Sequence, residues 1–580
     1  MQKNLASTPD GGQPRRSWWG TFDWTTPFTA LLALVLAVLV LLPIFWLLVT
    51  SLSDPEGGVT LRHYLQVFRD PAFVRPFLLS LWTSAATGAL CVLFAAPMGW
   101  LVARTNLPGK RLFRTLILAS FVTPPFLGAF AWTLLGGPNA GLINQWYYKI
   151  FGLTAFSATP LVNIYTAWGL VFVLFLYTFP YVFTLVANGL DYIPSELEEA
   201  SAILGAPVWR TALQITFPLV VPALLAGFIV AFLNAITLFG TPAILALPAG
   251  LNTLTTQIWS LFQFPPRYAL AAASSLPLLL LTVVLLRTQS AIMGRRGYSI
   301  VGGKSGGQRL IRLGWWKLPA VLIFVFVLSC SVILPYGALL KTAFVKTWSG
   351  PLSGSNLTLE HWRFVFFEFS QTQLAFKNTF ILGGLTATVG TVLITIIGYI
   401  TLRKLVWGHK SLSFLATAPI ALPGIVLGVG LFLSYTKEPL VLYGTLAIIF
   451  LAYLTKELPV GFQQINASLK TVHPELEDAS RILGANRLRA LWDITTPLVR
   501  NGVVATWLFF FIGSIRELSA TIILFTARTK TISVTIFDLR ESNDWGAIAV
   551  LSITLLVITF LVILLINVLT RQKSREGAVT

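Results

Sequence analysis

The sequence predicts an all-α polytopic membrane protein with about twelve transmembrane helices, arranged as two tandem six-helix units. Two observations on the 580-residue chain carry this prediction. First, 55% of the residues are hydrophobic and only 11% are charged, which is too little charge to cover a water-soluble protein of this length. Second, a short polar passage near residue 200 returns almost unchanged near residue 480, so the chain is duplicated internally.

The apolar stretches define the elements in chain order. Each is roughly 20 residues long, enough to cross about 30 Å of hydrocarbon as a helix. They are centred near residues 38, 90, 124, 172, 232, 277, 329, 388, 422, 450, 511 and 557. The predicted boundaries are a cytoplasmic tail at 1–25, a first unit at 26–288, a cytoplasmic linker at 289–316, a second unit at 317–570 and a cytoplasmic tail at 571–580.

Basic residues orient these helices. The net charge is +19, and the Lys and Arg residues gather in loops on one side, including 110–114, 287–317 and 571–575. With both termini placed in the cytoplasm, the inner loops contain roughly twice as many Lys and Arg residues as the outer loops, which follows the positive-inside rule. Membrane orientation therefore explains the charge, and we expect no binding of nucleic acid. The first apolar run is too long for a cleaved signal peptide, so we expect it to stay as the first span.

The duplication extends through most of both units. The segment 77–104 aligns with 376–403, and Pro124 falls on Pro423. The alignment then shifts before Pro180 and Pro459, so the first unit has about 20 extra residues, which we assign to an outer loop around 136–159. In duplicated transporters the substrate path typically lies between the repeats.

The repeated polar passage has the same register in both units. The first copy reads Glu196-Leu-Glu-Glu-Ala-Ser-Ala-Ile-Leu-Gly205 and then Ile215-Thr-Phe-Pro218. The second reads Glu475-Leu-Glu-Asp-Ala-Ser-Arg-Ile-Leu-Gly484 and then Ile494-Thr-Thr-Pro497. Both copies therefore fit the pattern acid-Ala-x4-Gly-x9-Ile-x2-Pro without a gap.

Each passage predicts a short acidic helix, a turn at glycine and a second short helix before the next span. Glycine permits the sharp turn because it has no side chain. Ala200, Ile203 and Leu204 give the first helix an apolar ridge beside its acids, which suits a groove lined with apolar and basic groups. The alternative is an amphipathic helix on the membrane surface, but such helices usually favour Lys and Arg over Glu.

These passages resemble the EAA loops of ABC importer permeases, by which such permeases grip their ATPase subunits. The resemblance implies two fused permease units in a bacterial plasma (inner) membrane, docking two copies of an ABC ATPase and working with a periplasmic or lipoprotein solute-binding protein. Asp478 stands where the family has Glu, and Ser201 and Ser480 replace its second alanine, so the two contacts could differ in strength. The predicted docking residues are Glu196, Glu199, Ala200, Gly205, Glu475, Asp478, Ala479 and Gly484.

We expect no ATP site and no cofactor in this chain. The best match to a phosphate-binding loop is Gly302-Gly-Lys-Ser305, but Gly297 is one residue too far away and no strand precedes the motif. ATP with Mg²⁺ would therefore bind to the partner ATPase, and the chain itself is not an enzyme. Its surroundings would be membrane lipid.

Charged residues inside predicted spans are functional candidates because burying them is costly. Arg516 and Glu517 lie about two-thirds of the way across the eleventh span, and their repeat partner is the segment 234–241. In the family that this chain resembles, these spans line the passage; the alternative is a purely structural ion pair. For Lys456 and Glu457 we favour structure or gating. The candidate pore-lining residues are Asn234, Thr237, Thr241, Ser514, Arg516, Glu517 and Ser519.

No metal site is predicted. The two cysteines, Cys91 and Cys330, lie in separate spans, and none of the four histidines is spaced to share a ligand set with another.

Over residues 26–570 the chain resembles fused permeases of the ferric-iron, thiamine and phosphonate group. Gly240-Thr-Pro242 and Arg516-Glu-Leu-Ser519-Ala resemble the ferric-iron branch, which makes ferric iron the first candidate cargo. The alternatives are 2-aminoethylphosphonate, a sugar phosphate, thiamine or a polyamine. An ion-coupled secondary transporter is the alternative class, although it would not need two matched acidic loops. A membrane enzyme would need a cluster of catalytic groups, and none is evident in the sequence.

Overall fold

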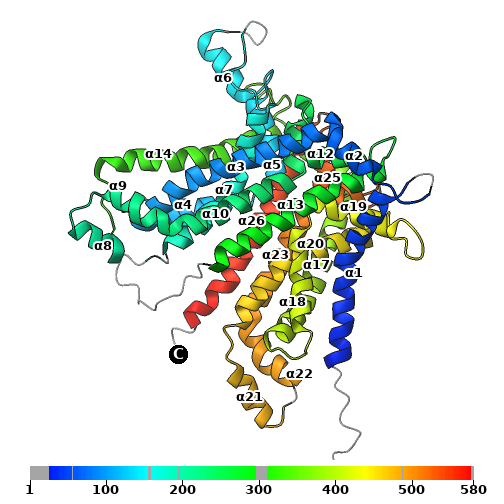
Figure 1. The fold of residues 1–580 in the computed structure, drawn as a ribbon. Helices are drawn as coiled ribbons and strands as arrows, with labels where there is room; N and C mark the ends of the chain where they lie inside the picture. The colour runs from blue at the N-terminus through cyan, green and yellow to red at the C-terminus, as the bar shows by residue number, and fades with distance from the viewer. Residues whose placement is uncertain are drawn as a thin grey trace, which may run out of the picture.

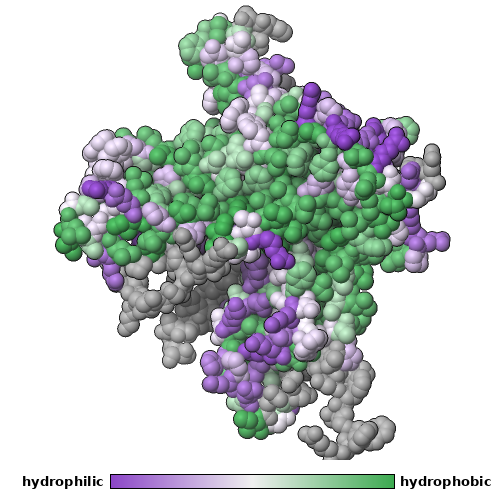
Figure 2. All heavy atoms as spheres, in the orientation of Figure 1, coloured by the Kyte–Doolittle hydropathy of each residue, from purple (hydrophilic) through white to green (hydrophobic). Residues whose placement is uncertain are grey.

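The computed structural model describes residues 25–54, 57–153, 158–191, 193, 196–295, 310–485 and 487–576. Within these ranges the chain is helical and contains no strand, which confirms the all-α membrane fold (Figure 1). Ten of the described helices are long and apolar enough to cross a membrane, and one bent pair raises the number to 11. Hydrophobic side chains form a broad band across the helices (Figure 2). Residues 1–24 of the predicted tail and half of the predicted linker at 289–316 lie outside the described residues.

The long helices follow the predicted order. Those of the first half are α1 (Thr25–Leu52), α3 (Pro71–Arg104), α7 (Ala167–Asp191), α10 (Phe217–Thr237) and α13 (Tyr268–Arg295). Those of the second half are α14 (Lys317–Leu328) continuing into α15 (Leu334–Ala343), α17 (Ser370–Leu402), α20 (Leu446–Leu469), α23 (Thr496–Ile515) and α26 (Trp545–Glu576).

Short helices connect these spans. They are α2 (Arg62–Arg69), α6 (Leu142–Phe151), α11 (Gly240–Leu245), α12 (Leu254–Ser260), α16 (Glu360–Arg363), α24 (Thr521–Leu524) and α25 (Ile532–Asp538). Single 3₁₀ turns cover Leu247–Ala249, Gly314–Trp316 and Ala418–Ala421, and π-helical turns cover Ser329–Ile333 and Phe364–Glu368. Helix α6 occupies the segment where the first half has extra residues, and it stands clear of the bundle at the top of Figure 1.

The third span of each half is broken, which corrects the prediction of continuous helices near residues 124 and 422. In the first half α4 (Lys110–Ser120) and α5 (Pro125–Gly136) meet at Pro124. In the second half α18 (His409–Thr417) and α19 (Gly424–Tyr435) meet at Pro423, and the pair is bent by 110°. Proline lacks the N–H that an α-helix needs and disfavours helical backbone in the residue before it, so both breaks fall at aligned prolines.

The two halves interlock through their first helices. Helix α1 packs against α13 of its own half and also along α18 and α19 of the other half. In the same way α15 packs against α26 and also against α5 of the first half. The buried side chains of both halves consequently form one large apolar cluster rather than two separate cores. A displacement of one half is therefore transmitted to the other by direct packing.

Candidate functional site

Two helical knobs project from the bundle where the EAA-like passages fall. We call α8 (Glu196–Ile203) with α9 (Val208–Thr211) the first knob, and α21 (Pro474–Ile482) with α22 (Arg487–Ala490) the second knob. A π-helical turn follows each knob, over Ala212–Thr216 and Leu491–Thr495, and leads into α10 or α23. In Figure 1 α8 lies at the left and α21 at the bottom, with the C-terminal end of the chain between them. The sequence repeat is thus a repeat of three-dimensional shape.

Glycine makes the turn in each knob. Gly205 and Gly484 have φ of 80° and 95°, a left-handed conformation that costs a residue with a side chain about 1–2 kcal/mol. The turn closes in the same way twice, because Ala206 N–H donates to Ser201 O and Ala485 N–H donates to Ser480 O, both at 3.1 Å. This 6→1 bond is the mark of a Schellman C-cap. The predicted glycine bend is present in both halves.

The tip of each knob is apolar and open to solvent. Ile203 and Leu204 are 86% and 87% exposed, and Ile482 and Leu483 are 85% and 89% exposed. Adjacent large apolar side chains with almost no contacts of their own mark an interaction surface rather than a core. Figure 2 shows hydrophilic side chains over the second knob around its apolar tip. Each knob therefore presents two exposed apolar side chains at its tip, with polar side chains nearby.

The predicted docking residues lie on the surface of these knobs. Glu199 is half-buried, whereas the other members of the set are exposed. His473 lies 3.5 Å from Glu475 at the start of the second knob. Their role in docking stays a prediction. The exposed members are Glu196, Ala200, Gly205, Glu475, Asp478, Ala479 and Gly484.

A buried ion pair, which the sequence analysis did not identify, fastens the first knob to the bundle. Arg104, the last residue of α3, donates to Glu198 Oε1 at 3.1 Å and to Ile193 O at 2.7 Å. The hydroxyl of Thr216 donates to the same carboxylate oxygen at 2.7 Å. The side chains of Arg104 and Glu198 are only 3% and 13% exposed. The knob is thereby tied both to the end of α3 and to the π-helical turn before α10.

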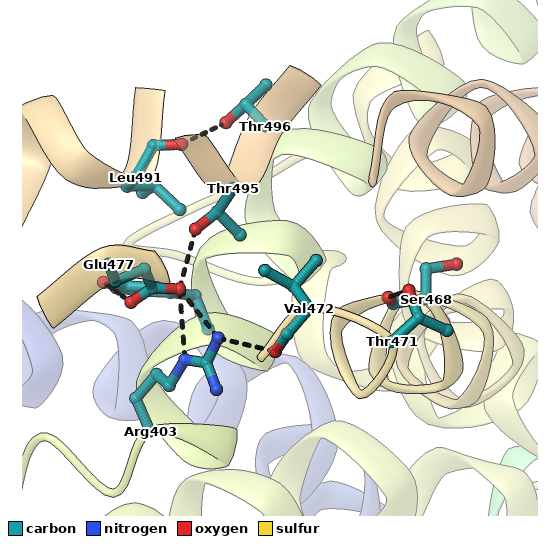
Figure 3. A network of polar contacts seen from close by, with 9 residues as sticks. Arg403, Ser468, Thr471, Val472, Glu477, Leu491, Thr495 and Thr496 are labelled. Atoms are coloured by element: carbon teal, nitrogen blue, oxygen red, sulfur yellow. Dashed lines mark hydrogen bonds and ion pairs between the residues drawn. The ribbon is translucent and has the colours of Figure 1, made fainter. Parts of the chain in front are cut away.

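The second knob repeats this arrangement with more contacts. Arg403 donates to Glu477 Oε1 at 2.8 and 3.2 Å, and to Val472 O at 3.2 Å. Thr495 donates to the same oxygen at 2.7 Å, and Tyr399 donates to Oε2 at 3.0 Å. Figure 3 shows Arg403 and Thr495 reaching Glu477 from opposite sides. We call these two groups the knob brackets.

The bracket changes the acidity of its carboxyl group. Burial alone would raise the pKa of Glu477, but the hydrogen bonds from Thr495, Arg403 and Tyr399 outweigh it, and the pKa lies below its ordinary value. Glu477 therefore stays ionised and holds its three donors. The signal for the brackets was present in the sequence, since Arg104, Glu198 and Thr216 have identical partners in the repeat.

A second polar cluster lies deep among the helices and corrects the predicted place of Arg516. Helix α23 ends at Ile515, so Arg516 caps its C-terminus instead of lying inside the span. A cation is favourable there because the carbonyl end of a helix is partly negative. The Arg516 guanidinium also reaches Phe121 O and Thr123 O at 3.4 and 3.5 Å. Those carbonyls belong to the break in the third span of the other half.

Glu517 pairs with Lys456 of α20, which joins two charges that the sequence analysis had treated separately. Its other oxygen accepts a hydrogen bond from Ala520 N at 2.9 Å. Glu457 lies against Gly513, where an added Cβ would be 2.4 Å from its carboxyl group. Two basic and two acidic side chains thus gather where α20 meets the end of α23. The cluster is balanced in charge.

The remaining pore candidates make local contacts. Asn234 and Thr237 donate to carbonyls one turn back in α10, at 2.9 and 2.7 Å, and Ser514 donates to Phe510 O at 2.8 Å. Thr241 is fully buried, whereas Ser519 is half-buried. Ser519 lies against Gly424 in the break of the second half. Whether these residues border a passage stays a prediction.

Among the described residues no three His, Cys, Asp or Glu side chains are grouped so as to hold a metal ion. Cys91 and Cys330 are both buried and free.

Comparison with known proteins agrees with the duplication. The family model "binding-protein-dependent transport system inner membrane component" matches twice, over residues 95–296 and 390–575. The ferric transport system permease protein FbpB of Actinobacillus pleuropneumoniae is 25% identical over 92% of this chain and 77% of its own length. A putative ferric transport system permease protein of Haemophilus influenzae is 26% identical over 81% of this chain and 73% of its own length.

Two other permeases each align with less than half of this chain. The molybdenum transport system permease protein ModB of Escherichia coli K12 is 30% identical over 34% of this chain and 83% of its own length. The putative 2-aminoethylphosphonate permease PhnU of Salmonella typhimurium is 27% identical over 46% of this chain and 91% of its own length.

Proposed function

Because this chain belongs to the binding-protein-dependent transport system inner membrane component family, we propose that it forms the passage of an ATP-driven importer whose cargo is ferric iron. Family membership makes it a multi-pass permease subunit of a bacterial inner membrane, which works with an ATPase and a solute-binding protein. The chain is not itself an enzyme, since separate subunits hydrolyse ATP in this family. Cargo, docking residues and stoichiometry belong to the proposal.

The two knobs carry the proposal of docking. They share a fold, an apolar tip, a glycine turn and a buried bracket, although they lie in different halves of the chain. Selection for solubility would not keep four large apolar side chains at 85% exposure or more. Two copies of one ATPase subunit would each present the same groove to one knob. The acids Glu199 and Asp478 would then meet basic groups at the rim of that groove.

The brackets suggest how force enters the membrane. Each knob is fixed to the end of α3 or α17 by a charged hydrogen-bonded pair, and to the start of α10 or α23 by a threonine. A pull on the knob is therefore carried to the second and fifth spans of its half. Arg516, which holds the carbonyls of the opposite half, lies at the far end of the fifth span. ATP-driven closure of the two ATPase subunits would separate or join the halves there.

Ferric iron is favoured as cargo because relatives that align along most of the chain bear names of ferric permeases. The molybdenum and 2-aminoethylphosphonate permeases align with only 34% and 46% of this chain. A solute-binding protein would deliver the iron from outside, so the passage needs no permanent metal site. Phosphonate, sugar phosphate, thiamine and polyamine remain alternative cargoes of the same machinery. We infer that both termini are cytoplasmic, since the described ends lie on the side of the knobs (Figure 1).

Reconstitution tests the proposal. Liposomes containing this chain, its ATPase and binding protein loaded with ⁵⁵Fe(III) should accumulate iron only when ATP is supplied. The double variant Glu199→Lys, Asp478→Lys should stop uptake while the chain still inserts and remains folded. Glu438→Lys, on the opposite side of the membrane, is the matched control and should leave ATPase capture unchanged. Uptake that continues without ATP and collapses with the ion gradient would instead establish a secondary transporter.

A further inference from the structure

A cavity with two lysines and a histidine in its lining opens on the knob side of the second half. It has a volume of about 280 Å³ and lies between the end of α17, the start of α18 and the end of α20. Leu402 and Phe462 give it an apolar wall, and its polar lining residues are Thr401, His409, Lys410, Ser413, Asn466 and Lys470. Neither the knobs nor the charge cluster around Arg516 contributes to it.

Two lining residues of the cavity differ in charge from the aligned residues of the first half. In the first half, Arg114 of α4 pairs with Asp191 at the end of α7, at 2.9 Å, across the equivalent helix contact. Alignment of the halves puts Ser413 at the position of Arg114 and Lys470 at the position of Asp191. The arginine is lost and the acid becomes a base. The ion pair that spans this contact in the first half therefore has no counterpart in the second.

The cavity attracts anions. Among the described residues no carboxylate pairs with Lys410 or Lys470. His409 stands at the first position of α18, where the free N–H groups of a helix make the potential positive. The histidine Nδ1 donates to Val406 O at 3.0 Å, which fixes the ring at the edge of the cavity. Two lysines, a helix N-terminus and the Ser413 hydroxyl form a set of donors that fits a phosphate, whereas the Thr401 hydroxyl donates to carbonyls of its own helix.

The surroundings indicate that this phosphate belongs to a lipid. Trp407, just before α18, is 99% exposed, and Phe414 on α18 is 59% exposed. Fully exposed tryptophans mark the level where lipid headgroups meet hydrocarbon. Basic pockets between transmembrane helices on the cytoplasmic side are typical sites for anionic headgroups. The cavity lies at such a level, next to the base of the second knob, since Arg403 directly follows α17 and lies two residues after Thr401.

We propose that this cavity binds the phosphate headgroup of an anionic phospholipid of the inner leaflet. Lys410 and Lys470 hold the phosphate, and Phe414 lies along the first part of an acyl chain. Such a site would couple the second knob, but not the first, to the lipid composition of the membrane. The proposal does not depend on the identity of the cargo or on the docking of an ATPase.

The test uses the full-length chain in non-ionic detergent, titrated with dioctanoyl phosphatidylglycerol and followed by native mass spectrometry. Dioctanoyl phosphatidylcholine is the matched uncharged lipid, and inorganic phosphate is the soluble competitor. The decisive variant, Ser413→Arg with Lys470→Asp, transplants the first-half ion pair into the cavity. It should weaken phosphatidylglycerol binding roughly fivefold, at about 1 kcal/mol for the net loss of one positive charge and tenfold for each 1.4 kcal/mol.

Two further variants keep the test decisive. Lys410→Gln with Lys470→Gln removes both lysine charges, should weaken binding roughly 30-fold at about 1 kcal/mol for each, and replaces the transplant if that variant does not fold. Arg114→Ser with Asp191→Lys, the reciprocal change, should leave the original site intact and create a second one. Equal binding of phosphatidylcholine, or unchanged phosphatidylglycerol binding in the transplant variant, would overturn the proposal. Complete displacement of phosphatidylglycerol by millimolar inorganic phosphate would assign the site to a soluble phosphate instead.

Discussion

Replacing Glu477 by alanine should destabilise the protein by about 3–4 kcal/mol, far more than any exposed acid of the same knob. The carboxylate is 8% exposed and accepts hydrogen bonds from three side chains. Its removal leaves the Arg403 guanidinium, itself 13% exposed, with only Val472 O as a described partner. Losing one member of a buried pair costs about 3–5 kcal/mol, and the partial exposure of Arg403 puts our value in the lower part of that range.

The measurement is a denaturation curve of the purified chain in mixed micelles. Glu475→Ala, two residues away and 84% exposed, is the control and should change stability by less than about 0.5 kcal/mol. Arg403→Ala with Glu477→Ala should cost less than the sum of the single changes, since the double variant leaves no buried charge. If Glu477→Ala proved as harmless as Glu475→Ala, the bracket would have no energetic role.

A functional measurement separates positioning from stability. If the bracket sets the angle of the knob, Glu477→Gln should lower iron transported per ATP hydrolysed at temperatures where the variant is fully folded. The exchanged pair Arg403→Glu with Glu477→Arg should recover part of that ratio, because it restores opposite charges at the same place. Loss of stability with an unchanged ratio would leave the bracket a purely structural feature.

Three other predictions follow from single residues. The stability advantage of the parent over Glu477→Gln should be complete above about pH 4.5 and disappear as the pH falls through the lowered pKa of the folded state, which thermal unfolding at stepped pH would detect. Gly205→Ala should lower ATPase capture in pull-down assays. Open space surrounds the new Cβ, but the left-handed backbone at this position costs alanine about 1–2 kcal/mol, and Gly205→Asn should lower capture less. Gly128→Ala should lower the melting temperature, because its Cβ would meet the Tyr177 ring at 1.9 Å, whereas Gly384→Ala has nothing within 4 Å and should not.

Properties that depend on local composition were predictable from the sequence. The long helices follow from runs of apolar residues, and the knobs follow from a polar passage that occurs twice. The breaks of the third spans were not predicted, although Pro124 and Pro423 were aligned, because an apolar run gives no sign of a bend. Hydrophobicity determines which segments enter the membrane, while a break depends on where the freed backbone groups find partners.

Contacts between distant residues could not be predicted in the same way. The ion pairs Arg104–Glu198 and Lys456–Glu517 join residues 94 and 61 positions apart. The residues next to each charge in the sequence do not indicate which distant residue it will contact. The repeat contained part of this information, since Arg104, Glu198 and Thr216 are all kept in the second half. Identity between halves that have otherwise diverged can therefore reveal a long-range contact in one chain alone.

If the knobs dock ATPase subunits as proposed, the differences between the halves predict an unequal response to ATP. The second bracket has a third donor, Tyr399, where the first half has Trp100, and Arg403 contacts its carboxylate through two nitrogens where Arg104 uses one. The four charges around Arg516 likewise have uncharged counterparts in the first half. A stiffer second knob would transmit force directly to α17 and α23, while the first could yield before α3 moves. Because α1 and α15 cross between the halves, movement that starts in the second half would still reach both.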